Sequence, residues 1–384
     1  MNKTKSKKFT GAELKKISKY SDEQIKKFEK LKKRKNIPEH EYLTKMKDEN
    51  NLVEFDNVCT WFFTDMGTVR AVDGVSFDIP KGKTIGIVGE SGCGKSVTSL
   101  SLMRLVQAPT GQIVSGEIRY NNGKRTVDIT KLPIKEMQKI RGNEIGMIFQ
   151  EPMTSLNPVF TIGLQIDEVI SLHNPKMSKA DVKKRAIEML DLVGIARAEG
   201  IYKSYPHELS GGMRQRAMIA MTLACDPQLI IADEPTTALD VTIQAQILDL
   251  LRGLKDKINA SIMLITHDLG VVAEMADYVA VMYAGRIIEK GTAEDIFLSP
   301  SHPYTIGLMG SKPVVGQDVE KLYSIPGNVP NPINLPDNCY FHGRCERCVE
   351  KCGGVYPPMV KLSDTHYVAC YLHEETKREE AWRK

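Results

Sequence analysis

The chain has 384 residues, of which 42% are hydrophobic and 26% are charged, and its formal net charge is +4. This composition is typical of a globular protein and argues against a disordered chain, and the length suits two or three domains. No stretch approaches the ~20 consecutive apolar residues that span a bilayer. The lysines near the N-terminus are not followed by the apolar run of a secretory signal. We therefore expect a cytosolic setting, in which persistent disulfides are rare.

Residues 1–49 are predicted to form a basic extension, because residues 1–50 carry a charge of +8 and the rest of the chain −4. Apolar residues recur near helical spacing from Leu14 to Leu31, and Ser21 and Gln24 have the spacing of a capping box. A basic amphipathic helix of this kind can lie on an anionic membrane or on nucleic acid, and a solvated tail is the alternative. The residues leave these alternatives open.

The segment 85–96, IGIVGESGCGKS, follows an apolar strand at 84–88 and leads into a helical stretch at 97–105. This is the setting of a P-loop. Glycines let main-chain N–H groups turn towards phosphate oxygens, Lys95 reaches the β- and γ-phosphates, and Ser96 offers a hydroxyl to Mg²⁺. The residues predicted to bind ATP here are Gly89, Ser91, Gly92, Gly94, Lys95, Ser96 and Val97.

A second glycine-rich turn feeds a helix at 209–215, LSGGMRQ. Such a turn at a helix N-terminus is also a phosphate-binding device. One chain with two such loops either folds both around one nucleotide or shares nucleotides with another subunit. The residues predicted to contact nucleotide are Ser210, Gly211 and Gly212.

The apolar strand QLIIADEP carries two acids at its end, Asp233 and Glu234. A carboxylate at the end of a buried strand beside a P-loop is placed to hold Mg²⁺, which predicts this role for Asp233. Glu234 is then placed to polarise the attacking water as a general base. Two acids at a strand end are also found in solvated turns, but the P-loop favours catalysis.

The chain resembles the ATPases of ABC transporters, because 210–215 is similar to their signature motif and the other motifs follow in order. The resemblance implies that ATP is bound between the P-loop of one subunit and the signature of another. It also implies that Gln150 contacts Mg²⁺, that His267 acts with Glu234 in catalysis, and that 236–240 form the D-loop of the family. Either Phe62 or Trp61 would stack on adenine.

The same resemblance implies an α/β fold with a RecA-like core, an antiparallel β lobe and a helical subdomain. The expected boundaries are 50–298 for the nucleotide-binding domain, about 152–225 for the helical subdomain within it, and 299–384 for a small Cys-rich extension. Short apolar strands alternate with amphipathic helices, as they do in doubly wound α/β proteins.

Three further stretches resemble the ATP-binding subunits of oligopeptide, dipeptide and nickel importers: EPMTSLNPVF, SPSHPYTIGLMGSKP and IPGNVPNP. The implied function is ATP hydrolysis that drives peptide import through two separate membrane permeases, at the cytoplasmic face of the membrane. The implied partners are a second, non-identical ATPase subunit and, indirectly, an external substrate-binding protein, with no nucleic acid. Import of nickel or another small solute is the alternative, and a soluble ABC ATPase outside transport is the more distant one.

Residues 152–168 are expected to form much of the permease contact, because they follow Gln150 directly. Met153, Leu156, Val159 and Phe160 would be an unusual exposed apolar group on a monomer. The alternative is that these side chains pack inside the helical subdomain.

Five of the eight cysteines lie between residues 339 and 370. Their spacing admits disulfides, a metal site or a redox site, and a reducing compartment favours metal or free thiols. Zinc held by Cys345 and Cys348 with His342, His366 or His373 is one interpretation. The family resemblance favours a four-iron, four-sulfur (4Fe–4S) cluster that closes a loop-rich domain, with Cys348 left over. The implied ligands are Cys339, Cys345, Cys352 and Cys370.

Overall fold

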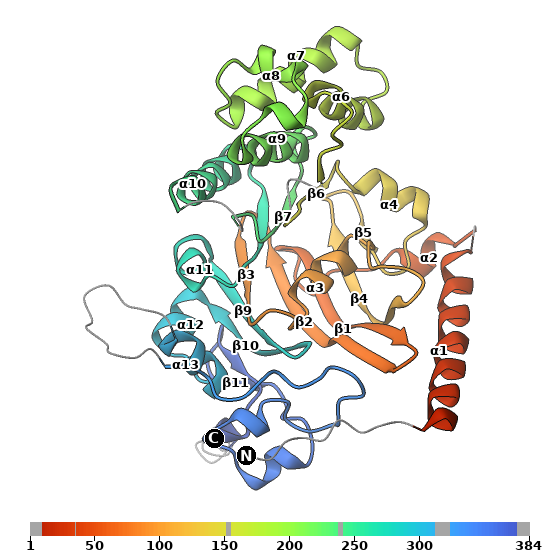
Figure 1. Ribbon diagram of the computed structural model, residues 1–384, viewed down its shortest axis with the longest axis vertical. Helices are drawn as coiled ribbons and strands as arrows, with labels where there is room; N and C mark the ends of the chain where they lie inside the picture. The colour runs from red at the N-terminus through yellow and green to blue at the C-terminus, as the bar shows by residue number, and fades with distance from the viewer. Residues whose placement is uncertain (1–9, 35, 151–154, 237–240, 312–322, 375–384) are drawn as a thin grey trace.

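The computed structural model describes residues 10–34, 36–150, 155–236, 241–311 and 323–374. Two β-sheets form the centre of the molecule, a layer of helices lies at one end, and an irregular C-terminal segment lies at the other (Figure 1). Among the described helices, none is long and apolar enough to cross a membrane.

A four-stranded antiparallel sheet forms the first lobe, with strand order β2-β1-β4-β5. β1 and β2 make a long hairpin in which Thr64 pairs with Gly67. Both strands are rich in β-branched and aromatic residues, which pack well on a pleated surface. The strands are β1 (Asn51–Thr64), β2 (Gly67–Pro80), β4 (Gly111–Asn121) and β5 (Thr126–Asp128).

The second sheet has eight strands in the order β11-β12-β10-β9-β3-β8-β7-β6. The five strands from β9 to β6 pair in parallel, and the other three extend the sheet in antiparallel pairs. The parallel strands are nearly all apolar, as expected where both faces of a sheet are covered. Their bounds are β3 (Thr84–Val88), β6 (Ile145–Ile148), β7 (Leu229–Asp233), β8 (Ser261–Ile265) and β9 (Tyr278–Tyr283), with β10 (Arg286–Thr292), β11 (Val360–Lys361) and β12 (Tyr367–Val368).

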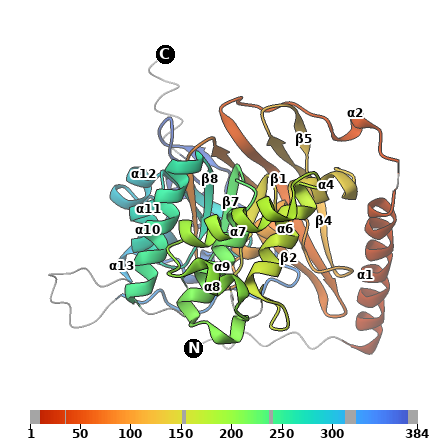
Figure 2. The same cartoon turned by 90° about the horizontal axis from the view of Figure 1, so that it is seen from above.

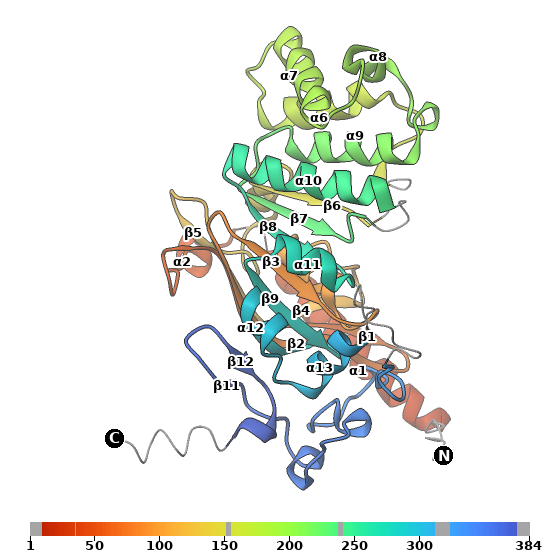
Figure 3. The same ribbon diagram turned by 90° about the vertical axis from the view of Figure 1, so that its left-hand side faces the viewer.

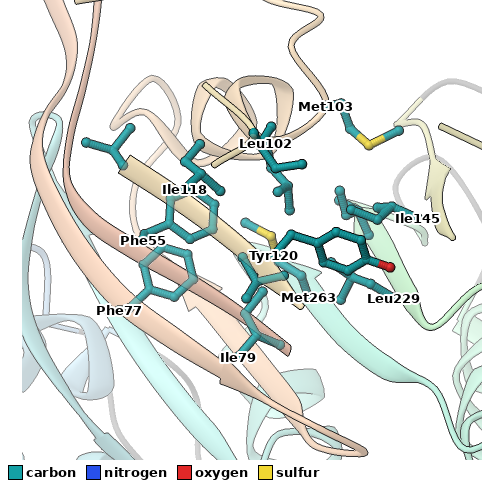
Figure 4. Close-up of a cluster of buried hydrophobic side chains, with 14 of the residues drawn as sticks. Phe55, Phe77, Ile79, Leu102, Met103, Ile118, Tyr120, Ile145, Leu229 and Met263 are labelled. Atoms are coloured by element: carbon teal, nitrogen blue, oxygen red, sulfur yellow. The ribbon is translucent and has the colours of Figure 1, made fainter. Parts of the chain in front are cut away.

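The two sheets share one hydrophobic core. Phe55 and Phe77 stack with their ring centroids 4.3 Å apart. Tyr120 belongs to the same cluster and lies near Leu229 and Met263 of the parallel sheet (Figure 4). This shared core holds the antiparallel lobe against the strand that precedes the predicted phosphate loop.

Helices cover the large sheet and extend beyond it. Helices α6 to α9 form a layer at the end of the molecule away from the C-terminal segment (Figures 1 and 3). A second core cluster joins this layer to β6, β7 and β8. The helices are α3 (Lys95–Leu102), α4 (Ile134–Ile140), α6 (Ile162–His173), α7 (Lys179–Leu192), α8 (Ala198–Lys203), α9 (Gly211–Leu223), α10 (Val241–Ile258), α11 (Leu269–Met275), α12 (Ala293–Leu298) and α13 (Pro303–Gly310).

The C-terminal segment, residues 323–374, has little regular structure. It contains three short 3-10 turns, η2 (His342–Arg344), η3 (Glu350–Gly353) and η4 (Tyr371–His373), and a further one, η1 (Pro206–Glu208), lies in the helical layer. β12 pairs with β10, so the segment completes the edge of the large sheet. A third core cluster joins its aromatic and cysteine side chains to β9 and α13.

The basic extension contains a helix, α1 (Gly11–Lys32), and a short helical turn, α2 (Glu39–Tyr42). α1 lies along the outer side of the antiparallel lobe, away from α10 to α13 (Figure 2). Phe28 stacks on Phe63 with ring centroids 6.1 Å apart. The predicted capping box at Ser21 is wrong: Thr10 caps the helix together with Glu13, and Ser21 is buried and donates to the carbonyl of Thr64 (2.9 Å).

Candidate active site

The phosphate loop joins β3 to α3, and its glycines have backbone conformations that other residues rarely adopt. Gly89 has φ of 154° and Gly94 has φ of 105°. A Cβ atom on Gly89 would lie 2.2 Å from the carbonyl oxygen of Met282, and one on Gly94 would lie 2.2 Å from that of Ala71. The loop is therefore pressed against β9 and β2, and neither position tolerates a side chain.

Lys95 is buried and turns back over the loop. Its Nζ donates to the carbonyl oxygens of Gly89 (2.8 Å) and Glu90 (3.1 Å). Lys95 opens α3, two residues before the predicted start of the helix, and Val97 is half-buried. Ser91 and Gly92 form the exposed rim of the loop.

Ser96 and Asp233 meet at the ends of neighbouring elements. The Ser96 hydroxyl donates to Asp233 Oδ1 at 3.0 Å, and Asp233 is the last residue of β7. Burial raises the pKa of Asp233 to about 6, and the neighbouring charge of Glu234 adds to this rise. A hydroxyl and a carboxylate that lie together beside a phosphate loop are oxygen ligands of the kind that Mg²⁺ prefers, so these residues fit a magnesium site.

Glu234 lies between two other predicted site residues. Gln150 Nε2 donates to Glu234 Oε2 at 3.2 Å, and His267 Nδ1 lies 3.5 Å from Glu234 Oε1. The φ of Glu234 is 48°, in the left-handed region that is unfavourable for a residue with a side chain. Strain of this kind often marks functional positions, because surrounding contacts must maintain it.

The signature residues lie on a different layer from the phosphate loop. Ser210 caps α9, and its hydroxyl accepts from the N–H of Met213 at 3.4 Å. Gly211 and Gly212 open the helix. α9 packs on α6, α7 and β6, whereas α3 packs on β1, β2 and β7. The two predicted phosphate-binding loops are thus carried by separate parts of the fold.

The aromatic pair at the end of β1 is half-buried. The guanidinium of Arg70 lies over the ring of Trp61, 5.1 Å from its centroid. Phe62 lies against Gly111, where an added Cβ would be 2.8 Å from the ring. β1 is tied to the helix after the phosphate loop, because the hydroxyls of Thr60 and Ser101 are 2.8 Å apart.

Two predicted segments are only partly described. Residues 237–240, most of the expected loop after Glu234, and Met153 lie outside the described residues. Leu156 is 4% exposed, so the expectation that it belongs to an exposed apolar group is wrong; it packs inside the core of the helical layer. Val159 and Phe160 are exposed.

The sequence motifs did not single out Glu90, the second residue of the phosphate loop. Its carboxylate contacts Arg344 of the C-terminal segment, and its main-chain N–H donates to the hydroxyl of Tyr304 at 2.9 Å. No local pattern signals these contacts, because the partners lie 254 and 214 residues away in the sequence.

Three of the four cysteines of the predicted ligand set, Cys339, Cys345 and Cys352, pack in one hydrophobic cluster, and Cys370 belongs to a neighbouring one. Burial is the main cause that raises the pKa of Cys339 to about 12, and negative charge on Cys352, Cys370 and Cys345 would add to the rise. The Cys339 N–H donates to the Cys352 carbonyl at 3.0 Å. Cys348 is exposed.

Neither the zinc site nor the predicted 4Fe–4S ligand set is found as a metal site among the described residues. In the described ranges, no three His, Cys, Asp or Glu side chains are placed to hold a metal ion. The histidines are used elsewhere: His366 Nε2 lies 2.8 Å from Glu289 Oε1, His342 Nδ1 lies 2.8 Å from the carbonyl of Cys339, and His373 Nε2 lies 3.0 Å from that of Ser301.

The fold and site together define an ABC-type ATPase. Residues 72–237 match the family profile described as ABC transporter. Two solved dimeric structures of the ATP-binding cassette MJ0796, one of them bound to ADP and phosphate, are 27% identical to this chain with a TM-score of 0.56. Each match covers 63% of this chain and 98% of the cassette. The predicted α/β fold is thereby confirmed.

A narrower family follows from the remaining matches. Residues 288–352 match the C-terminal region of oligopeptide/dipeptide transporters. The oligopeptide transport ATP-binding protein AppD of Bacillus subtilis is 52% identical over 332 residues, which are 86% of this chain and all of that protein. The dipeptide transport ATP-binding protein DppD of Lactococcus lactis is 51% identical over 84% of this chain and 91% of its own length. The chain belongs to the family of oligopeptide and dipeptide transport ATP-binding proteins.

Proposed function

We propose that the chain is the ATP-hydrolysing subunit of a peptide importer. The observation that carries this proposal is the group formed by Ser96, Asp233 and Glu234 beside the phosphate loop, with Gln150 and His267 in contact with Glu234. The same family of relatives supports peptide as the cargo. Nickel or another small solute is the alternative cargo, because selection of the cargo rests with other subunits.

The residues divide the work of ATP hydrolysis as follows. Main-chain N–H groups of the phosphate loop and the ammonium of Lys95 bind the phosphates. Ser96, Asp233 and Gln150 would hold Mg²⁺, which would neutralise phosphate charge. Glu234 accepts a proton from the attacking water, and His267 orients the Glu234 carboxylate and the γ-phosphate. Phe62 or Trp61 stacks on the adenine ring.

The working unit in this proposal contains two ATPase subunits. The signature residues Ser210, Gly211 and Gly212 are carried by α9, in a separate layer from the phosphate loop, so they are suited to a nucleotide held by another subunit. The dimeric state of the related MJ0796 cassette supports this arrangement. We favour a non-identical sister subunit as the partner.

The subunit would bind two membrane permeases at the cytoplasmic face of the membrane, and an external binding protein would deliver the peptide to them. Val159 and Phe160 support a contact near the start of the helical layer, since they are 69% and 45% exposed and follow Gln150 by only about ten residues. We expect Val159→Glu or Phe160→Glu to abolish transport while the isolated subunit still folds and binds ATP. Loss of folding in both variants would contradict the contact.

We further propose that the thiols of Cys339, Cys345, Cys352 and Cys370 hold a 4Fe–4S cluster. Cys339, Cys345 and Cys352 pack in one hydrophobic cluster, which supports the proposal, and a cluster of four irons needs ligands that are spread more widely than those of one zinc ion. The role would be structural, because the C-terminal segment has few strands and helices of its own. Protein purified without oxygen should be brown with about four irons per chain, Cys370→Ser should bleach it, and Cys348→Ser should not. Colourless wild-type protein would refute the cluster.

Purification of the complete transporter from its native membrane tests the proposed function. We expect two permeases and two different ATPase chains in the complex, with ATP hydrolysis stimulated by peptide and its binding protein. A complex whose hydrolysis responds to nickel and not to peptide would change the cargo. A fully active ATPase monomer would contradict the shared site.

A further inference from the structure

The phosphate loop is held from outside by the C-terminal segment. Arg344 Nη1 donates to Glu90 Oε2 at 3.0 Å, and Nη2 donates to Glu90 Oε1 at 3.1 Å. This is a bidentate ion pair, the strongest geometry that arginine and a carboxylate form. The Arg344 side chain is only 8% exposed and that of Glu90 is 28% exposed. The pair is therefore partly shielded from water and salt, unlike an ordinary surface ion pair.

Other contacts fix both ends of this pair. The Glu90 N–H donates to the Tyr304 hydroxyl at 2.9 Å, so the main chain and the side chain of Glu90 are both held. Arg344 Nε donates to the carbonyl of Pro326 at 2.9 Å, and Nη1 donates to the Tyr283 hydroxyl at 3.3 Å. The rings of Tyr283, Tyr304 and Phe341 pack together beneath, with centroids 4.7 to 5.5 Å apart.

The pair is connected directly to the group that binds phosphate. The Glu90 carbonyl oxygen accepts from Lys95 Nζ at 3.1 Å. A shift of Glu90 would therefore move one of the groups that hold the Lys95 ammonium. The charge of Glu90 matters as well, because an uncompensated carboxylate on the phosphate loop would repel the phosphates of ATP.

We propose that Arg344 is a positioning residue of the ATP site: it neutralises Glu90 and holds the phosphate loop in its ATP-binding shape. Through this residue the C-terminal segment sets the affinity for ATP. Arg344 lies within the stretch 339–370 that contains five cysteines, directly before Cys345. This inference rests on the proposed function, because it concerns the same ATP site.

The test compares Arg344→Gln with Arg347→Gln in the full-length chain. Arg347 is exposed and lies in the same segment, which makes it a matched control. The measurements are the dissociation constant of Mg·ATP by titration calorimetry, and KM and kcat in the assembled transporter. We expect Arg344→Gln to weaken ATP binding and raise KM about 5-fold or more, with kcat changed by less than about 3-fold. Arg347→Gln should leave all three at the wild-type value.

Two further variants separate positioning from a loss of folding. Glu90→Gln combined with Arg344→Gln removes the uncompensated charge, so the double variant should bind ATP more tightly than Arg344→Gln alone. Arg344→Lys keeps the charge but not the two-pronged geometry, so its affinity should be intermediate. A folding defect that is unrelated to the charge of Glu90 would not be repaired by the second substitution.

The outcomes are distinct. Wild-type affinity in Arg344→Gln would overturn the inference, as would an equal or greater loss of affinity in the double variant. If the wild-type chain itself did not bind Mg·ATP, the proposed function would fail instead.

Discussion

A buried carboxylate in the ATP site and one that contacts the C-terminal segment have pKa values shifted in opposite directions. In the ATP site, Asp233 and Glu234 are adjacent acids, and burial raises the pKa of Asp233 to about 6. Where β10 meets the C-terminal segment, Glu289 is fully buried, and although burial opposes its ionisation, hydrogen bonds from His366 and from the main-chain N–H groups of His302 and Ser301 lower its pKa. The chain therefore stabilises the ionised form of Glu289 well and that of Asp233 poorly.

This difference follows from what each region does. A carboxylate that the protein has already neutralised gains little from a metal ion, whereas Asp233 has much to gain from bound Mg²⁺. Glu289 is held by the main chain at Ser301 and His302, and it anchors β10 to His366 of the C-terminal segment. Arg344 connects the two regions, because it belongs to the C-terminal segment and neutralises the carboxylate of Glu90 in the phosphate loop.

The largest effect is expected from Glu234→Gln. The amide retains the size and hydrogen bonding of the side chain but cannot accept a proton. We expect hydrolysis to fall by about 10²- to 10⁴-fold, with ATP still bound. Turnover and nucleotide binding by the purified transporter are the measurements that check this prediction. Near-normal turnover would show that Glu234 is not the general base.

Lys95→Ala should weaken the binding of ATP itself, in addition to any effect on the hydrolysis step. It removes the ammonium that the phosphates are expected to meet, and charged hydrogen bonds of this kind contribute about 1.5–3 kcal/mol. We therefore expect ATP affinity to fall about 10- to 100-fold, measured by calorimetry. Unchanged affinity would mean that the phosphates do not lie beside Lys95.

His366→Ala should destabilise the fold without a direct effect on the ATP site. Glu289 would lose a side-chain partner at 2.8 Å while staying buried, at a cost of about 2 kcal/mol in the free energy of unfolding. Chemical denaturation measures it. The control is Lys361→Ala, which breaks the exposed pair with Asp364 and should leave stability unchanged. Equal effects of the two substitutions would contradict the distinction between buried and exposed pairs.

A smaller, pH-dependent effect is expected at His302. Burial lowers its pKa to about 4, opposed by Glu289 and assisted by His373. Between pH 6.5 and 4 the unfolded chain binds a proton that the folded chain does not, so the free energy of unfolding falls as the pH falls. From pH 7.5 to 5.5 this group should account for about 1.3 kcal/mol.

His302→Asn provides the comparison, because asparagine retains an acceptor for the Tyr304 N–H at the start of α13 but does not titrate. Denaturation curves at both pH values should show a smaller loss of stability in the variant. An identical loss in both proteins would mean that His302 does not contribute.

Local spacing predicted strand β3, the phosphate loop and the acids at the end of β7, because each of these features depends on only a few consecutive residues. The Ser21 capping box failed because Thr10 and Glu13 offer a second one, and docking of α1 on Phe63 decides between them. The Glu90–Arg344 contact was not predictable from local pattern, since folding alone brings those residues together. The pair Cys345 and Cys348 suggested zinc with a nearby histidine as a further ligand, but the buried partner of His366 is Glu289, 77 residues away in the sequence.

The central claim, that this chain hydrolyses ATP to drive peptide import, is tested most directly in vesicles containing the complete transporter. ATP consumed and peptide accumulated would be measured in the same preparation, with wild-type chain and with Glu234→Gln. We expect the wild-type vesicles to accumulate peptide in proportion to the ATP hydrolysed, and the variant to bind ATP yet lose both activities together. Peptide accumulation that continues in the Glu234→Gln vesicles without hydrolysis would contradict the account.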